Sequence, residues 1–374
     1  MTANYIFTDN GVDYDFSDVF IKKEFFSDNI AVASGTNTAG QLGIGTSTSI
    51  SSFVQLGGAQ DWAYISGPFF STAGVKLNGT LWTWGSGANG QLGSGATTSR
   101  SAPVQVGALT DWVYAIPAAD CMVALKTDGT IWSWGRNFHG YLGLGDTTDR
   151  SSPVQIGVAT TWRQIDSWGS NTAAVNNNGT LWTCGYNGNG ELGHGDITSR
   201  STLTQVGALT TWDHVSCGNS TMAAIKTDGT LWTWGVNTVG QLGVGDTTNR
   251  SSPIQVGVLT DWKKVQCGNS YIIATKTDGT MWAWGNGTNG NLGNGSSAHQ
   301  SSPVQIGALT NWNQLYRGPA ATKTDGTLWI WGNNTSGRFG NNTTTSISSP
   351  VQIGTNKNWK SIGTQEDGSI LIRY

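Results

Sequence analysis

The side chains that could do chemistry in this 374-residue chain are few and scattered. The four cysteines include no CxxC pair, so we expect buried free thiols in a reducing compartment. The four histidines fall at four different positions of the repeated unit, which predicts no metal site. No serine, cysteine or carboxylate pair recurs with a base at a motif spacing, so we expect neither an enzyme nor a cofactor. The cysteines are Cys121, Cys184, Cys217 and Cys267, and the histidines are His139, His194, His214 and His299.

One recurring segment contains glycines and acids that could bind an ion. It reads VNTVGQLGVGDTTNRSSP at residues 236–253, and its Gly-x-Gly-Asp would suit a calcium loop or a phosphate cradle. The segment recurs in nearly every unit and is not followed by a helix, so we expect an ordered turn capped by side-chain oxygens. An arginine with a nearby aspartate should hold this turn together. The arginines are Arg100, Arg150, Arg200 and Arg250, which keep the 50-residue spacing, and the nearby aspartates are Asp146, Asp196 and Asp246.

The whole chain is built from one repeated unit. Phrases like LWTWG at residues 231–235 occur six times, and the glycine of GxLG recurs five times after 50 residues and once after 47. In the unit at 211–257, we predict strands at 212–217, 221–226, 230–234 and 253–257. Asp228-Gly229 suits a type I′ turn between the second and third strands. Four antiparallel strands, repeated about seven times, predict an all-β fold, a seven-bladed β-propeller.

Strands from the two ends of the chain can be combined into a seventh unit. Residues 359–362 and 369–373 align with the first and second strands, whereas residues 30–35 and 54–57 align with the third and fourth. We therefore expect the seventh blade to combine strands from both termini, which closes the ring and protects its strand edges. The expected domains are an attachment segment at residues 1–29 and a propeller at residues 30–374.

Charge is low overall but concentrated at the beginning. The net charge of −3 leaves no basic stripe, so we expect no nucleic-acid partner. Residues 1–29 alone carry a net charge of −4, and they lack the features of a secretory signal. No stretch of the whole chain is apolar enough for membrane insertion. Alternating aromatic residues in this segment suit a strand added to a partner sheet. The anchor candidates are Tyr5, Phe7, Tyr14, Phe16, Phe20, Phe25 and Phe26.

A binding site on a repetitive ring must differ between units. The first-to-second and third-to-fourth connections leave the same face, and on that face the copies diverge. Aromatic residues and arginine there predict a contact patch for a protein or a glycan. The alternative is that these side chains plug the central tunnel or cover neighbouring loops. The candidates are Phe69, Phe70, Arg136, Phe138, His139, Tyr141 and Trp168.

The repeated phrases LWTWGxNxxGQLGxGD, SSPVQ and KTDGT resemble repeats of the regulator of chromosome condensation family. This resemblance covers residues 30–374 and implies a seven-bladed propeller. It does not imply one activity, because such propellers include a nucleotide exchange factor, a UV-B photoreceptor and a β-lactamase-inhibiting protein. A histidine common in the family is replaced here by Thr221 and Tyr271, and neither the exchange factor's wedge nor the photoreceptor's Gly-Trp-Arg-His-Thr run is present.

The Thr/Ser/Asn-rich units and the opening YIFTDNGVDYDFSDVFIKKEFF also resemble proteins of tailed phages, particularly those of marine cyanobacteria. This resemblance implies a noncatalytic virion structural or decoration protein, assembled in the host cytoplasm. Residues 1–29 would anchor it to other virion proteins, and the variable face could meet a host-surface protein or glycan. Two alternatives stay open: a host-receptor or glycan-binding lectin, and an intracellular protein-docking regulator.

Overall fold

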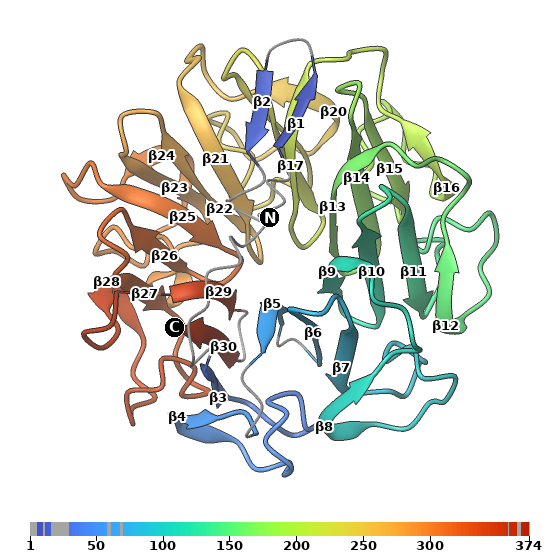
Figure 1. Ribbon diagram of the computed structural model, residues 1–374. Coiled ribbons are helices and arrows are strands. Elements are labelled where there is room, and N and C mark those ends of the chain that lie inside the picture. Colours follow the sequence, from blue (N-terminus) through green and yellow to red (C-terminus); the bar gives the residue numbers. More distant parts are fainter. Residues whose placement is uncertain are drawn as a thin grey trace.

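Seven four-stranded antiparallel sheets form a closed ring in the computed structural model (Figure 1). The structure describes residues 6–9, 12–15, 30–57, 61–67, 70–357, 359–364 and 368–373. The first strands of neighbouring blades contact one another all the way round, so they form the inner wall of the ring. This architecture confirms the predicted seven-bladed β-propeller.

Six blades are each made from one continuous stretch of chain. Blades 1 to 3 contain β5 (Trp62–Ser66), β6 (Ser71–Lys76), β7 (Leu81–Gly85), β8 (Arg100–Gln105), β9 (Trp112–Pro117), β10 (Cys121–Lys126), β11 (Ile131–Gly135), β12 (Arg150–Gln155), β13 (Trp162–Trp168), β14 (Asn171–Asn176), β15 (Leu181–Gly185) and β16 (Arg200–Gln205). Blades 4 to 6 contain β17 (Trp212–Cys217), β18 (Thr221–Lys226), β19 (Leu231–Gly235), β20 (Arg250–Gln255), β21 (Trp262–Cys267), β22 (Tyr271–Lys276), β23 (Met281–Gly285), the short 3-10 helix η2 (Thr288–Gly290), β24 (Gln300–Gln305), β25 (Trp312–Tyr316), β26 (Ala320–Lys323), β27 (Leu328–Gly332) and β28 (Ile347–Gln352).

The seventh blade joins the two ends of the chain, as predicted. Its order is β29 (Trp359–Thr364), β30 (Gly368–Arg373), β3 (Ile30–Gly35) and β4 (Ile50–Gln55). β30 and β3 pair antiparallel along their whole length, from Arg373 opposite Ile30 to Gly368 opposite Gly35. In Figure 1, the dark red β30 therefore lies beside the dark blue β3.

Two local predictions were wrong. The fourth strands begin and end earlier than expected: β20 covers Arg250–Gln255 instead of 253–257, and β4 covers Ile50–Gln55 instead of 54–57. The polar start of β20 pairs with the third strand across a bulge, Arg250 opposite Gly235, and Gly257 has a φ of +63° just beyond the strand. Because this strand lies at the outer edge of its sheet, it needs no alternating apolar pattern.

The turns between second and third strands are not type I′. In the turn after Lys126, Gly129 has a φ of +74° but Asp128 does not have a positive φ, and the Gly129 N–H donates to the Lys126 carbonyl at 3.0 Å. A left-handed glycine after such a turn is the pattern of a three-residue hairpin loop. The Asp128 carboxylate accepts the N–H and the hydroxyl of Thr130 at 2.9 and 2.7 Å. The acid therefore orders the turn through its side chain.

Tryptophans from the third strands fill the seams between blades. Trp234 is fully buried, and its indole N–H donates to the carbonyl of Glu191 in the previous blade at 2.8 Å. A Cβ on Gly193 would come within 2.8 Å of this nitrogen, so the second glycine of GxLG leaves room for the next blade's tryptophan. The repeated GxLG and LWTWG phrases therefore form one packing contact.

The beginning of the chain forms a separate two-stranded sheet of β1 (Ile6–Asp9) and β2 (Val12–Asp15), in which Phe7 stands opposite Tyr14. The other anchor candidates, Tyr5, Phe16, Phe20, Phe25 and Phe26, lie outside the described residues. In the part of the chain that is described, no helix is long and apolar enough to cross a membrane.

Candidate functional site

The first-to-second and third-to-fourth connections share one face of the ring, as expected, and we call it the loop face. The backbone shows this directly, because the N–H of Arg136, just after the third strand, donates to the carbonyl of Asp120, just before the second, at 2.9 Å. The same bond joins Val236 to Ser220 in blade 4 at 2.8 Å. Side chains from different connections can therefore meet on this face.

An exposed cluster on the loop face contains three of the predicted residues. Phe138 is 63% exposed, and its ring lies 4.6 Å from the His139 ring and 5.7 Å from the Arg136 guanidinium carbon. Arg136 pairs with Asp120 at 3.2 Å, and His139 packs against Tyr186 of the next blade at 4.9 Å. We call Asp120, Arg136, Phe138, His139 and Tyr186 the aromatic patch.

The other predicted residues are not part of this cluster. Tyr141 is 4% exposed and packs with Cys121 and Leu142, and Trp168 is 7% exposed. Phe70 is 44% exposed but belongs to the connection of another blade. Phe69 lies outside the described residues. The structure therefore divides the candidate face into an exposed patch and buried side chains.

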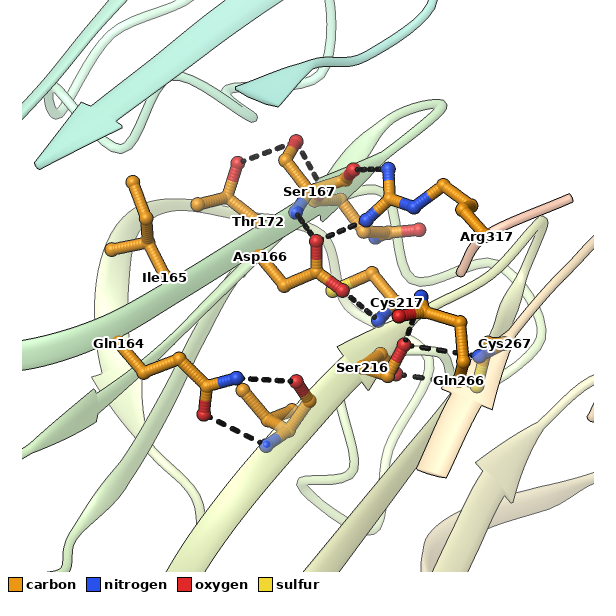
Figure 2. Close-up of polar contacts among 12 residues, drawn as sticks. Gln164, Ile165, Asp166, Ser167, Thr172, Ser216, Cys217, Gln266, Cys267 and Arg317 are labelled. Atoms are coloured by element: carbon orange, nitrogen blue, oxygen red, sulfur yellow. Dashed lines mark hydrogen bonds and ion pairs between the residues drawn. The ribbon is translucent and has the colours of Figure 1, made fainter. Parts of the chain in front are cut away.

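Trp168 packs against Arg317, which belongs to a polar network that joins nearly opposite blades, and Figure 2 shows Arg317 beside Asp166 and Ser167. Arg317, which follows β25 in blade 6, forms an ion pair with Asp166 of β13 in blade 3. Arg317 also donates to the Ser167 carbonyl at 2.6 Å and lies 4.9 Å above the Trp168 ring. The two charged side chains are only 12% and 8% exposed. The pair therefore connects two nearly opposite blades inside the protein.

The Asp166 carboxylate has partners on both oxygens. One oxygen accepts the Ser167 N–H at 2.9 Å as well as Arg317, and the other accepts the Cys217 N–H of the neighbouring blade at 2.8 Å. A carboxylate held by these three donors has a fixed position and little access to solvent. This arrangement supports a structural role for Asp166.

The buried thiols near this network are poor nucleophiles. Burial raises the pKa of Cys217 and of Cys267 above the usual range of a cysteine, so both stay protonated near neutral pH. Burial also raises the pKa of Cys121, to about 12. Among the described residues, no group of three or more His, Cys, Asp or Glu side chains could hold a metal ion.

The predicted arginine–aspartate pairs hold the third-to-fourth connections. Arg200 binds Asp196 at 2.8 Å and donates to the Thr198 carbonyl at 2.8 Å. The same ion pair joins Arg150 to Asp146 and Arg250 to Asp246, at 2.6 Å each. The hydrogen bond from Arg200 lowers the pKa of the Asp196 carboxyl well below its usual value. The prediction that these pairs stabilise loops is confirmed.

Sequence reasoning missed the partners that assemble these groups. Asp120 and Asp166 differ visibly from the repeat, but their partners Arg136 and Arg317 lie 16 and 151 residues away. The sequence did contain one signal for these contacts. Each acid and each arginine differs from the residues at the same position in other units, and these departures lie on the same face. Tyr186 gave the same kind of signal, because in blade 3 it occupies the variable position that Arg136 occupies in blade 2.

Comparison with known proteins places this geometry among related propellers. The model of the RCC1-like domain family matches residues 30–369. Among solved structures, yeast RCC1 (Prp20) bound to Kap60 is 15% identical, with 92% of this chain and 89% of that chain covered and a TM-score of 0.81. Prp20p from Saccharomyces cerevisiae, studied with its binding to Gsp1p and histones, is 15% identical, with 98% and 95% covered and a TM-score of 0.84. Human WBSCR16 is 17% identical, with 93% and 99% covered and a TM-score of 0.81. No curated protein sequence matches the chain.

Proposed function

Because the chain belongs to the family of RCC1-like domains, we propose that it works without catalysis, by binding a partner protein through its loop face. The observation that carries this proposal is the aromatic patch. A phenylalanine that is 63% exposed, flanked by an ion-paired arginine and by a histidine in edge-to-face contact, has the composition of an interface hot spot. Because neighbouring side chains already hold the group, little conformational freedom is lost on binding.

Substitution of Phe138 tests this role without disturbing the ring. The equivalent residue of blade 1 is Ala88, so Phe138→Ala places a residue that the repeat already uses. For a surface position we expect a change in unfolding free energy of no more than about 0.5 kcal/mol. Ile197→Ala is the matched control, because Ile197 is 66% exposed in the next blade's connection and outside the patch.

The unchanged protein, Phe138→Ala and Ile197→Ala are each immobilised and exposed to an extract of the source or host cells. The captured proteins are then quantified by mass spectrometry. We expect at least one protein to bind the unchanged protein and Ile197→Ala but not Phe138→Ala. Equal capture by all three proteins would rule out the patch as the binding surface.

We propose that the protein is part of a phage virion, to which residues 1–29 anchor it. The acidic, aromatic opening of the chain and its resemblance to tailed-phage proteins support this proposal. Deleting residues 1–29 should remove the protein from purified particles. It should leave the melting temperature of the ring unchanged, because the first propeller strand begins at Ile30. Detection of the truncated protein in virions would contradict the anchor role.

The solved relatives support an intracellular alternative. Yeast RCC1 has been solved with Kap60, and Prp20p has been studied for binding to Gsp1p and histones. Mass spectrometry of purified virions separates the two settings. Absence of the full chain from particles, together with capture of a host protein that depends on Phe138, would favour the intracellular docking protein.

A further inference from the structure

The face opposite the loop face carries a lysine in five of the six continuous blades. This face contains the turns between second and third strands and the connections that lead into each first strand, and we call it the turn face. Each lysine ends a second strand and stands opposite the tryptophan that begins the first strand, as Lys226 stands opposite Trp212. The ammonium group lies over tryptophan rings in every case. The lysines are Lys76, Lys126, Lys226, Lys276 and Lys323.

In three blades this lysine has an aspartate as its partner. The pairs are Lys76 with Asp61 at 3.0 Å, Lys126 with Asp111 at 3.5 Å, and Lys276 with Asp261 at 3.4 Å. Each aspartate directly precedes a first strand. The aspartate side chains are exposed, whereas the lysine side chains are largely buried. A carboxylate therefore reaches the ammonium from the solvent side of the turn face.

Blades 4 and 6 keep the lysine but have no acid at the partner position. Thr211 and Asn311 stand where the other blades have aspartate. The backbone at this position is unchanged, because the Thr227 N–H donates to the Thr211 carbonyl at 2.9 Å, as the equivalent threonine of blade 2 does to its aspartate. Within the residues that the structure describes, no ion pair joins Lys226 or Lys323 to an acid. A neutral side chain thus occupies the place of the carboxylate.

Blade 3 shows what happens when both partners are exchanged together. Asn176 replaces the lysine, Thr161 replaces the aspartate, and the Asn176 amide donates to the Thr161 hydroxyl at 2.8 Å. This pair is neutral and hydrogen-bonded. Blades 4 and 6 have made only one of the two exchanges, so each retains a positive charge whose counter-charge has been removed.

The position of Lys226 makes this missing charge costly. Lys226 is 9% exposed, and its Nζ lies 3.7 Å from the ring centre of Trp232 and 5.0 Å from that of Trp212. Burial lowers the pKa of Lys226 and of Lys323 below the usual value of a lysine. Asp228 of the adjacent turn opposes this shift at Lys226 but is weaker than burial. A carboxylate brought to the empty partner position would stabilise the ammonium form.

Exposed apolar side chains accompany these positions. Leu209 and Leu309, each two residues before the neutral residue, are exposed. In the connection of blade 5, which lies between them in the ring, Val258 is 86% exposed. A small anion gains little from such side chains, whereas a protein surface would bury them. The turn face over blades 4 to 6 therefore suits a protein that presents acids.

We propose that the turn face of blades 4 and 6 binds an acidic segment of a partner protein, whose Asp or Glu carboxylates complete the ion pairs of Lys226 and Lys323. Each carboxylate takes the place that an aspartate of the chain itself occupies in blades 1, 2 and 5. A segment that contacts both lysines gains affinity, because the second contact is intramolecular. This surface lies opposite the aromatic patch and is a second interaction site, independent of the loop face.

The test is NMR of the full chain with isotope-labelled lysine side chains, titrated with an oligoglutamate peptide at constant ionic strength. Oligoglutamine, acetate and inorganic phosphate are titrated separately. We expect saturable shifts of the Lys226 and Lys323 signals with oligoglutamate and none of the three lysines that already have an aspartate. Acetate should bind the same two lysines at least about tenfold more weakly.

Four results of these titrations would overturn the proposal. They are an unaffected Lys226 signal, equal shifts of all five lysines, binding of oligoglutamine or acetate as tight as that of oligoglutamate, and tighter binding of phosphate. Tight acetate binding would indicate a site for a free carboxylate, and tight phosphate binding a site for a phosphorylated ligand.

Variants taken from the repeat localise the binding. Thr211→Asp introduces the aspartate of other blades, so the Lys226 shift should disappear and the affinity for oligoglutamate should fall about tenfold. Thr161→Asp is the matched control, because it adds the same charge to the same face in the blade where Asn176 replaces the lysine. It should bind nearly as well as the unchanged protein, since exposed charges one blade away are largely screened. An equal loss of affinity in both variants would refute the site.

The reverse exchange should create a site. Asp111→Thr removes the partner of Lys126 and gives blade 2 the residue of blade 4. The Lys126 signal should then respond to oligoglutamate as the Lys226 signal does in the unchanged protein. A folded Asp111→Thr protein whose Lys126 signal does not respond would contradict the proposal, as would a Lys226 response that persists in Thr211→Asp.

Discussion

At the scale of single residues, His194 shows how burial in this propeller changes the pKa of a side chain. Its Nε2 lies 3.0 Å from the Thr183 hydroxyl, and burial lowers the pKa of the imidazole to about 4. An unfolded histidine has a pKa of about 6.5, so below that pH the unfolded chain binds a proton that the folded chain does not. His194 therefore makes the fold less stable as the pH falls from about 6.5 towards 4.

This pH dependence should disappear when the imidazole is removed. His194→Asn places the residue of Asn294, its equivalent in blade 5. Urea unfolding at pH 7 and pH 5 should show a larger loss of unfolding free energy for the unchanged protein than for the variant. Equal losses in both proteins would mean that His194 does not carry the effect.

A candidate contact residue must both depart from the repeat and be exposed to solvent. Phe138 and Arg136 fulfil both conditions. Tyr141 and Trp168 depart from the repeat equally clearly, yet the structure buries them. A departure shows that a position is special, but a partner far away in the chain decides whether it faces solvent or the interior.

At the scale of the elements, Trp232 and Trp234 separate two roles on one strand. Trp234 is fully buried between blades, whereas Trp232 is only partly buried, with the Lys226 Nζ 3.7 Å from its ring centre. Because they are two residues apart in a strand, both side chains project from the same face of the sheet. The structure shows that only the inner tryptophan is enclosed.

Alanine substitution should therefore cost different amounts at these two positions. Trp234→Ala removes a fully buried ring and should lower the unfolding free energy by about 3–5 kcal/mol. Trp232→Ala, the matched control on the same strand, should cost clearly less. Calorimetry of the two variants measures the difference, and equal costs would contradict the packing described.

The strand pattern was predictable because each unit repeats the same strongly apolar second and third strands. The fourth strand was misplaced because its pairing at Arg250 depends on a backbone bulge, which leaves no mark in residue type. The turn type was also wrong, because Asp-Gly suits more than one hairpin loop.

At the scale of the whole molecule, the Asp166–Arg317 pair connects blades that are distant in sequence. Removing one partner of a buried ion pair leaves the other charge uncompensated, so Arg317→Ala should lower the unfolding free energy by about 3–5 kcal/mol. Arg150→Ala breaks a more exposed pair and should cost about 0–1 kcal/mol. Denaturant unfolding compares the two variants, and a similar small effect for both would show that the central pair contributes little.

Ring closure was predictable from the sequence, but the ion pair that connects nearly opposite blades was not. Residues 30–35 and 369–373 could be aligned with known positions of the unit, so their meeting followed from the repeat. The central ion pair joins positions 151 residues apart, three units along the ring, and nothing in the repeat predicts that these two departures meet. The step of 47 residues at blade 6 was visible in the sequence, but the shortening of β26 to four residues was not.

Completion of the seventh blade by β30 has a consequence for synthesis of the protein. At ribosomal rates of ~5–20 residues per second, β30 follows β3 by roughly 340 residues, or about 15–70 s. During that interval Ala31, Val32 and Ala33, all buried in the finished protein, wait for their neighbouring strand. Translation therefore sets the earliest moment at which the seventh blade, and with it the ring, can close.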